Sequence, residues 1–381
     1  MRKEDLDTPE LLVDLQVLER NISKMQKLTD SVGVHLRPMT KTHKIPEVAR
    51  MQVEAGSYGI QCAKLGEAEV MADAGIKDIF ISNEIIGEKK IKRLMGLAKK
   101  VTITIAIDSF YGAAAVSKIA ERHGLRLATL IAIDVGNRRS GVLPEEPALQ
   151  LAKKVKRLGG IDLKGIYTHE GNVYTAKNEK ELKEKSLAAA EDMVNTAKLL
   201  ESKGIPVEVV SVGSTPGVKY NATYPGITEV RPGAYIFNDI SQIDYGFCGL
   251  EDCAVSIMVT IISKPAPGRV LCDAGSKEIF PPVEWMRFKN GAVLLDWARV
   301  EIGTIVGLNH RPLPGVALEK IHEEYGFITL AENAPELNIG EKIEIIPYHI
   351  CPNLNLWDEI TVIEDGEVKI SWPIAARGKF K

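Results

Sequence analysis

The sequence contains no strongly basic block and no long apolar run. Its 48 lysines and arginines nearly balance its 51 aspartates and glutamates, which gives a net charge of −3, so we expect no nucleic-acid partner. No stretch approaches the roughly 18 consecutive apolar residues that a membrane-spanning helix needs. The first residues, Met1 to Leu6, lack the apolar core of a secretion signal. The composition therefore predicts neither a nucleic-acid-binding protein nor a membrane protein.

Cysteine is scarce and scattered. An odd number does not form the paired framework of a small secreted domain, and the five cysteines are Cys62, Cys248, Cys253, Cys272 and Cys351. We therefore expect a cytoplasmic protein with free thiols, or with one thiol at a metal. At 381 residues the chain exceeds one core of typical size, which predicts two domains.

The first two thirds of the chain alternate between β-branched runs and amphipathic helical stretches. The eight strand-like runs lie at 34–41, 58–63, 78–83, 101–108, 128–134, 163–169, 207–213 and 228–235. Eight parallel strands with intervening helices predict a (β/α)₈ TIM-type barrel, which we assign to residues 16–245. A doubly wound open sheet is the alternative, but the glycine-rich turn expected after one of its early strands is absent.

Strands dominate after residue 250, which predicts a C-terminal all-β domain. The runs lie at 254–263, 269–272, 299–306, 327–330, 342–347, 359–363 and 368–372. Turn signals such as Ala266-Pro267-Gly268 separate them. The opening segment 8–15 is also strand-like. We assign residues 1–15 and 246–381 to this β-domain.

The first predicted strand ends in the basic segment Arg37-Pro38-Met39-Thr40-Lys41-Thr42-His43-Lys44. In barrels of this class, catalytic residues gather at the C-terminal ends of the strands. A lysine there is nucleophilic only when its amine loses a proton, and burial and neighbouring positive charge favour that loss. Lys41 could then form a Schiff base with pyridoxal phosphate, with Arg37, Lys44 and His43 supplying the charge. A solvated basic turn is the alternative.

Polar residues close the other predicted strands, and their convergence on one rim predicts a pocket. They include Gln61, Asn83, Asp108, the segment 134–139 and His169. His169 shares strand parity with Tyr167 and Gly171, so we expect the three to face one side. The ordinary pKa of a histidine such as His169 suits proton transfer near neutrality. A structural histidine is the alternative.

A segment rich in small residues, Ser211-Val212-Gly213-Ser214-Thr215-Pro216-Gly217, follows the seventh predicted strand. Small residues let backbone N–H groups approach an anion, and hydroxyls add donors. Barrels commonly bind phosphate after their seventh and eighth strands. The segment Arg231-Pro232-Gly233-Ala234-Tyr235 would complete such a site, unless both segments are ordinary turns.

His349-Ile350-Cys351 is the third candidate site. Residues two apart on an extended segment point to the same face, so both side chains could bind one ion. Imidazole plus thiolate favours Zn²⁺ over Mg²⁺ or Ca²⁺. Two ligands do not complete a site, so water and substrate oxygens would have to fill the remaining positions.

Taken in order, these segments resemble the D-threonine aldolase/D-serine dehydratase family, metal-dependent enzymes with the fold of bacterial alanine racemase. The likeness covers nearly the whole chain. It rests on residues 7–14, the lysine segment, and residues 63–69, 134–136, 213–216, 273–277 and 349–351. Met39 stands where relatives usually carry histidine.

The resemblance implies pyridoxal phosphate bound covalently to Lys41, and a divalent metal at His349 and Cys351. Zn²⁺ is the expected ion, with Mn²⁺ and Mg²⁺ as alternatives. The other residues implied around the cofactor are Arg139, His169, Gly213, Ser214, Thr215, Arg231, Gly233 and Tyr235. Arg231 is implied at the pyridine nitrogen and Arg139 near the phenolic oxygen. The resemblance also implies a homodimer.

The implied activity is a lyase reaction on a small β-hydroxy-D-amino acid such as D-serine, D-threonine or 3-hydroxyaspartate. We expect dehydration to a 2-oxo acid and ammonia, because a thiolate ligand suits Zn²⁺, as in the family's D-serine dehydratases. Lys41, His169 and Tyr167 are the expected catalytic residues. Retro-aldol cleavage to glycine and an aldehyde is the first alternative. An amino-acid racemase and a non-catalytic pyridoxal-phosphate carrier are further alternatives.

Overall fold

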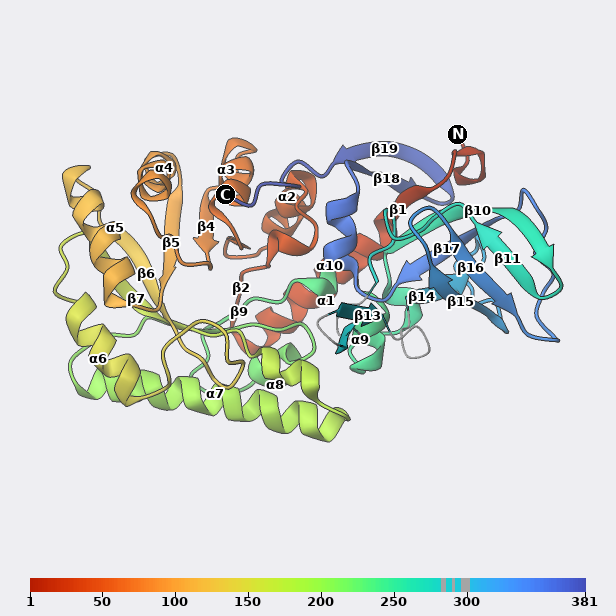
Figure 1. Ribbon diagram of the computed structural model, residues 1–381. Coiled ribbons are helices and arrows are strands. Elements are labelled where there is room, and N and C mark those ends of the chain that lie inside the picture. The colour runs from red at the N-terminus through yellow and green to blue at the C-terminus, as the bar shows by residue number, and fades with distance from the viewer. Residues whose placement is uncertain (282–285, 290–291, 296–301) are drawn as a thin grey trace. The chain divides into compact units, whose positions relative to one another are not determined.

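Figure 1 shows the computed structural model, which describes residues 1–281, 286–289, 292–295 and 302–381. The chain divides into two compact units. The barrel unit contains residues 22–235 and 376–381, and the β-unit contains residues 1–21 and 236–375. Helix α1 (Leu15–Val32) contributes residues to both. None of the described helices combines the length and apolar character that crossing a membrane requires.

The barrel unit is built on eight parallel strands in the order β2-β9-β8-β7-β6-β5-β4-β3. They are β2 (His35–Leu36), β3 (Ile60–Cys62), β4 (Asp78–Ile81), β5 (Thr102–Ile107), β6 (Leu127–Ala132), β7 (Ile161–Tyr167), β8 (Val209–Val212) and β9 (Glu229–Val230). A parallel bridge between Met39 and Gln61 joins the two edges of this sheet. The predicted (β/α)₈ barrel is confirmed.

A helix follows each of the first seven strands, as the alternating pattern predicts. The helices are α2 (Pro46–Glu54), α3 (Leu65–Asp73), α4 (Glu88–Ala98), α5 (Phe110–Arg122), α6 (Glu146–Val155), α7 (Glu179–Ser202) and α8 (Val218–Asn221). Side chains satisfy the first free N–H groups of two of them: Ser109 caps α5 and Asn178 caps α7.

Side chains from four neighbouring strands form one buried cluster of the barrel. Its members are Phe80, Ala106, Leu130, Ala132 and Tyr167. Gly165 lets β7 approach β8, because a Cβ at this position would overlap the backbone of Val209. Its φ of +156° is also one that other residues rarely adopt.

The first and last barrel strands are shorter than the sequence predicts. Lys41 lies in a 3₁₀ turn, Thr40–Thr42, and Tyr235 lies in another, Ala234–Ile236. Pro38 and Pro232 follow the two strands, and proline has no N–H to donate to a strand ladder. Lys41 and Tyr235 are therefore held by turns.

The β-unit contains a nine-stranded sheet in which β15-β16-β11-β10-β1-β18-β19 form one path, while β17 pairs with β10 and β14. Strand β1 lies antiparallel to β10 and parallel to β18. Its strands are β1 (Glu10–Asp14), β10 (Val255–Ala266), β11 (Arg269–Cys272), β14 (Gly303–Val306), β15 (Val316–Ile321), β16 (Gly326–Leu330), β17 (Lys342–Pro347), β18 (Glu359–Glu364) and β19 (Glu367–Pro373). Two short helices, α9 (Ile240–Asp244) and α10 (Ile350–Asn353), belong to the same unit.

The sequence prediction of the β-unit omits three strands. Strand β15 has buried Val316 and Leu318 alternating with exposed neighbours, a pattern that could have revealed it. The hairpin of β12 (Met286–Lys289) and β13 (Ala292–Leu295) is also additional. Of the predicted strand 299–306, residues 299–301 lie outside the described residues and 303–306 form β14.

Candidate active site

Lys41 is exposed, whereas Thr40, Thr42, His43 and Lys44 around it are buried. The Thr40 hydroxyl donates to the carbonyl of Gln61 at 3.0 Å, which ties the turn to β3. In the described part of the chain, the Lys41 amine has no hydrogen-bond or ion-pair partner. A rigid turn therefore presents one unpaired amine.

The expectation that neighbouring cations act on a buried Lys41 is wrong. Arg37 pairs with Glu229 and Asp78, and Lys44 pairs with Glu67. Burial lowers the pKa of His43 to about 3, so this ring is neutral. The charges of Arg37 and Lys44 are paired because both side chains are buried, where an unpaired charge would be costly.

Arg231 is the centre of a buried hydrogen-bond network. Its Nε donates to Ser211 Oγ at 2.7 Å, its Nη1 donates to Gln61 Oε1 at 3.0 Å, and its Nη2 donates to the carbonyl of Thr168. The Ser211 hydroxyl in turn donates to Glu229 at 2.7 Å. These contacts fix the direction of the guanidinium group.

His169 and Glu170 together bind the two backbone polar groups of Gly213. His169 Nδ1 donates to the Gly213 carbonyl at 2.6 Å, and the Gly213 N–H donates to Glu170 at 2.9 Å. Because a carbonyl only accepts, Nδ1 carries the hydrogen and Nε2 keeps its lone pair. Burial, followed by the positive charges of Lys41 and Arg139, lowers the pKa of His169 to about 3. The His169 ring is therefore neutral.

The predicted phosphate segment forms a loop, residues 213–217, which Glu170 supports. The Ser214 hydroxyl and the Asn221 amide both donate to Glu170 at 2.7 Å. Two predicted phosphate donors, the Gly213 N–H and the Ser214 hydroxyl, are therefore already used. Among the described hydrogen bonds, none uses the N–H of Ser214 or Thr215, although both residues are buried. These two N–H groups are suited to an anion.

Arg139 lies close to both His169 and Tyr167, because its charge lowers the pKa of each. Burial, and the nearby Glu84, raise the pKa of the Tyr167 phenol, which donates to the Ser82 carbonyl at 2.7 Å. Arg139 is exposed in the loop 134–139, where Asp134 accepts the N–H groups of Gly136 and Arg138 at 3.0 Å. Gly171 begins a 3₁₀ turn, so the expected strand parity ends at Tyr167.

Gly233 and Tyr235 follow the last barrel strand. A Cβ on Gly233 would lie 2.8 Å from the Thr42 hydroxyl, so only glycine lets this turn pack against the Lys41 turn. The Tyr235 side chain is fully buried, and its hydroxyl accepts from Gln52 at 2.9 Å. This places the Tyr235 hydroxyl in the core next to α2.

His349 and Cys351 lie in the β-unit, close enough that Cys351 contributes to the protonation of His349. Burial opposes that protonation, but the charge of Cys351 and the hydrogen bond with Asp239 outweigh it and raise the pKa of His349 well above its usual value. The buried Asp239 lies 3.5 Å from His349 Nδ1 and accepts the Ile350 N–H at 2.9 Å.

The expectation that an extended segment aligns the pair is wrong. His349 precedes α10, and Cys351 lies in its first turn. Within the described ranges, no group of three or more His, Cys, Asp or Glu side chains is placed to hold a metal ion. The pair therefore needs further donors.

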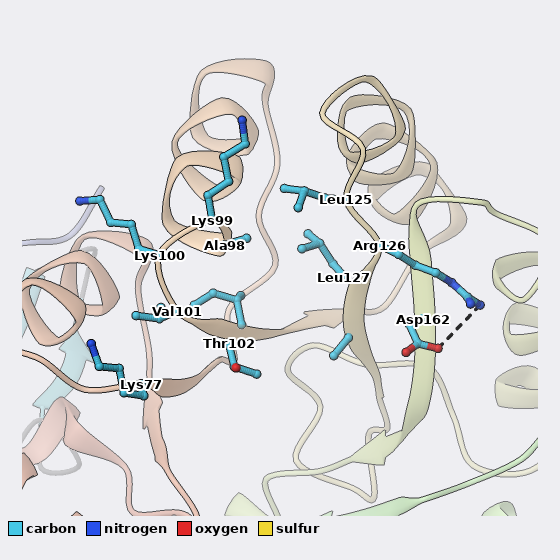
Figure 2. A pocket seen from close by; sticks show the side chains of 12 residues that line it. Lys77, Ala98, Lys99, Lys100, Val101, Thr102, Leu125, Arg126, Leu127 and Asp162 are labelled. Carbon is cyan, nitrogen blue, oxygen red and sulfur yellow. Dashed lines mark ion pairs between the residues drawn. The ribbon is translucent and has the colours of Figure 1, made fainter.

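A groove of about 480 Å³ lies at the opposite ends of the barrel strands (Figure 2). Lys77, Thr102 and Leu127, which line it, precede or begin β4, β5 and β6. Its exposed lysines are spread along the rim in Figure 2, and Arg126 pairs with Asp162 at 3.7 Å. The groove is separate from the site built around Lys41.

Comparisons with known proteins agree with this geometry. The family "Alanine racemase, N-terminal domain" matches residues 13–240, and the family "Putative serine dehydratase domain" matches residues 254–363. A D-threonine aldolase from Arthrobacter sp. is 32% identical over 98% of this chain and 93% of its own. The chain belongs to the D-threonine aldolase/D-serine dehydratase family.

Another member of this family, the D-threo-3-hydroxyaspartate dehydratase from Delftia sp. (strain HT23), is 32% identical over 91% of each chain. Solved structures of a dehydratase of that name include an alanine variant of a histidine and one of a cysteine two positions later. The cysteine variant is in the metal-free form; it has a TM-score of 0.87, 30% identity, and coverage of 98% of both chains. This chain is an enzyme, a pyridoxal-phosphate-dependent lyase.

The residues described above fit the cofactor of the D-threonine aldolase/D-serine dehydratase family. The Lys41 amine is accessible and unpaired, and two buried N–H groups of the 213–217 loop lack acceptors. His349 and Cys351 also fit a metal, because imidazole and thiolate are zinc donors and Asp239 lies 3.5 Å from His349 Nδ1, where a carboxylate can orient the ring.

Sequence reasoning placed Gln61 at the rim of the pocket but missed Glu170 as a supporting residue of the site. Glu170 accepts three hydrogen bonds, and Gln61 accepts from Arg231. Glu170 directly follows His169, just beyond the end of β7, and its position beside a predicted site residue could have marked it.

Proposed function

We propose that this lyase uses pyridoxal phosphate and a divalent cation, Zn²⁺ above Mn²⁺ or Mg²⁺, to dehydrate β-hydroxy-D-amino acids. The products would be a 2-oxo acid and ammonia, from a substrate such as D-serine or D-threo-3-hydroxyaspartate. The observation that carries the choice of dehydration is the imidazole and thiolate pair of His349 and Cys351. Such a donor set favours Zn²⁺, a Lewis acid suited to assist departure of a hydroxyl group.

Residues of the barrel would hold the cofactor. Lys41 would bind it covalently, and the N–H groups of Ser214 and Thr215 would donate to its phosphate. Arg231, fixed by three hydrogen bonds, would orient its pyridine nitrogen. When bound, pyridoxal phosphate withdraws electrons from the substrate Cα, and the cation polarises the β-hydroxyl.

Lys41 and His169 would move the protons. In its neutral form, Lys41 Nζ would accept the proton from Cα, because its side chain is accessible and not committed to a carboxylate. His169 Nε2 would accept a hydrogen bond at the substrate side, since Gly213 holds the hydrogen of this ring on Nδ1. Tyr167 would stay protonated and form part of the wall, because its hydroxyl donates to Ser82.

Retro-aldol cleavage is the second candidate, and the hydrogen bond of His169 to Gly213 favours it. With its hydrogen held on Nδ1, the imidazole could take the proton of the β-hydroxyl at Nε2, after which the Cα–Cβ bond would break. The aldolase and dehydratase relatives are both 32% identical to this chain, so overall identity does not separate the two reactions.

We further propose a cytoplasmic homodimer. The family resemblance supports the dimer, and the five described cysteines, which form no disulfide, support a reducing compartment. Light scattering would test the dimer.

The reaction is tested with a panel of D-serine, D-threonine and D-threo-3-hydroxyaspartate. Each substrate is assayed with a chelator and with added Zn²⁺ or Mn²⁺, and the products are identified. Ammonia and a 2-oxo acid, formed only with metal, are the expected result. Glycine and an aldehyde without ammonia would contradict dehydration and establish the second candidate.

A further inference from the structure

The turn that carries Lys41 is closed by two backbone hydrogen bonds. The N–H groups of His43 and Lys44 both donate to the Thr40 carbonyl, at 3.1 and 2.8 Å. Lys44 has a φ of +58°, in the left-handed region that non-glycine residues seldom adopt. Such a conformation persists only where surrounding contacts hold it, so the contacts of Lys44 determine the shape of the turn.

Lys44 is anchored to α3 through its side chain. It is 4% exposed and forms an ion pair with Glu67, which is 1% exposed. Glu67 also accepts the N–H groups of Ala63 and Lys64, at 2.8 and 3.1 Å. The Lys44 ammonium is therefore a structural anchor, and Lys41 is the amine left free.

The last residues of the sequence cover this anchor, although they follow the β-unit in the chain. The Ala376 N–H donates to the Lys44 carbonyl at 3.1 Å, and the Lys44 ammonium lies 5.4 Å from the centre of the Phe380 ring. A Cβ on Gly66 would lie 2.7 Å from the Lys381 carbonyl oxygen. Figure 1 shows this end of the chain beside α2 and α3.

We propose that residues 376–381, the tail, position Lys41 by holding Lys44. The inference rests on the proposed role of Lys41 in cofactor binding. The tail meets Lys44 at two points, the carbonyl and the ammonium, and the Lys44–Glu67 pair beneath it is buried away from water. Excluding water strengthens an ion pair. A fixed Lys44 keeps the 40–44 turn in one conformation, and small displacements of a reacting group are costly in rate.

Phe380 offers the sharpest test, because one face of its ring covers Lys44 while 59% of the residue is exposed. Removing it should therefore leave the core unchanged. We compare Phe380→Ala with Phe380→Tyr, which keeps the aromatic face, and with Lys381→Ala, which removes an exposed side chain from the same tail. The first readout is hydrogen exchange at the N–H groups of His43 and Lys44 in cofactor-free protein. The second is the rate at which the absorbance of lysine-bound cofactor disappears on dilution.

In Phe380→Ala we expect faster exchange at His43 and Lys44 and a cofactor dissociation rate raised roughly two- to fivefold, the size of an exposed cation–π contact. Phe380→Tyr and Lys381→Ala should behave like the parent protein. Unchanged exchange at these two positions would overturn the proposal. Faster exchange spread evenly over α2 and β3 would overturn it too, because the tail would then support the fold generally.

Lys41→Ala separates this inference from the proposed function. If that variant keeps the absorbance of lysine-bound cofactor, the proposed role of Lys41 fails. The exchange measurement on cofactor-free Phe380→Ala still reports whether the tail holds the 40–44 turn. If Lys41→Ala loses the absorbance and Phe380→Ala changes neither readout, the tail proposal alone fails.

Discussion

Arg231 in the barrel and His349 in the β-unit are both proposed ligand-binding residues, yet they are held very differently. Arg231 is 4% exposed and makes three side-chain hydrogen bonds. The His349 side chain is 37% exposed and has Asp239 as its carboxylate partner. Three hydrogen bonds within the barrel fix Arg231 before any ligand binds, whereas the pair in the β-unit still needs donors.

This difference separates two ways of preparing a site. The barrel fixes the Arg231 side chain by burial, where polar groups are costly unless they find partners within the protein. The β-unit keeps its two ligands partly exposed, and ligands of this kind are completed when the metal binds. We therefore expect changes in the barrel network to alter stability and cofactor affinity together. Changes in the pair should alter metal affinity and leave cofactor affinity unchanged.

Replacing Lys41 should have the largest effect on turnover. Lys41→Ala removes the proposed covalent anchor and base, so we expect activity to fall by about a thousandfold or more. The free energy of unfolding should stay within about 0.5 kcal/mol, because the side chain is exposed and unpaired. Activity assays and denaturant unfolding would measure both. Lys77→Ala, an exposed lysine at the opposite ends of the strands, is the control. Full turnover by Lys41→Ala would refute the proposed site.

Replacing a metal ligand should be the next largest change. In His349→Ala and in Cys351→Ala we expect activity to drop about a hundredfold, mainly through weaker metal binding. Excess Zn²⁺ should restore part of it, and the absorbance of bound cofactor should be unaffected. Titration with Zn²⁺ under metal-depleted conditions would measure the change in metal affinity. His123→Ala, which replaces an exposed histidine of the barrel unit, should leave metal affinity unchanged. If these variants lost cofactor absorbance as strongly as they lost activity, the contrast between the two regions would fail.

The sequence predicts the barrel because its signals are local. Each strand and helix carries its own periodicity, and strand ends identify Lys41, His169 and residues 213–215 without knowledge of the fold's details. The early ends of β2 and β9 could also have been predicted, since Pro38 and Pro232 interrupt the ladders.

The supporting contacts of the site could not be predicted, because they join distant parts of the chain. Arg37 meets Glu229 across 192 positions, and Glu170 meets Ser214 across 44. Which carboxylate compensates which cation depends on the register of the closed barrel. Cys351 illustrates a local failure: a short helix replaces the expected extended segment, and the distant Asp239 accepts the first N–H of that helix, from Ile350.

A smaller effect is expected when Glu170 is changed. In Glu170→Gln the amide group cannot accept the Gly213 N–H and the Ser214 hydroxyl together, so one buried donor loses its partner. We expect the free energy of unfolding to fall by about 1–3 kcal/mol and cofactor affinity to fall about tenfold, as the 213–217 loop loosens. Equilibrium unfolding and cofactor titration would measure both. Glu201→Gln, on the exposed side of α7, is the control. If Glu170→Gln lost stability but kept its cofactor affinity, the 213–217 loop would not be a cofactor-binding loop.

The smallest predicted effect contrasts two histidines. Burial lowers the pKa of His43 to about 3, below the ordinary value of about 6.5 in the unfolded chain. Between these values the unfolded chain binds a proton that the folded protein excludes. The contribution of His43 to stability is therefore present above pH 6.5 and is lost as the pH falls. His349 has the opposite sign, because its pKa is raised in the folded protein; without metal, its contribution is lost as the pH rises.

His43→Asn keeps an acceptor for the Ile45 N–H, which now donates to Nδ1 at 3.0 Å, and removes the titration. Lowering the pH from 6.5 to 5.5 should therefore destabilise the parent protein by about 1 kcal/mol more than this variant. Denaturant unfolding at the two pH values measures the difference. His349→Ala in metal-free protein should change the pH dependence in the other direction. If both variants shifted the pH dependence the same way, burial would not distinguish the two histidines, and the contrast between buried barrel residues and a partly exposed metal pair would fail.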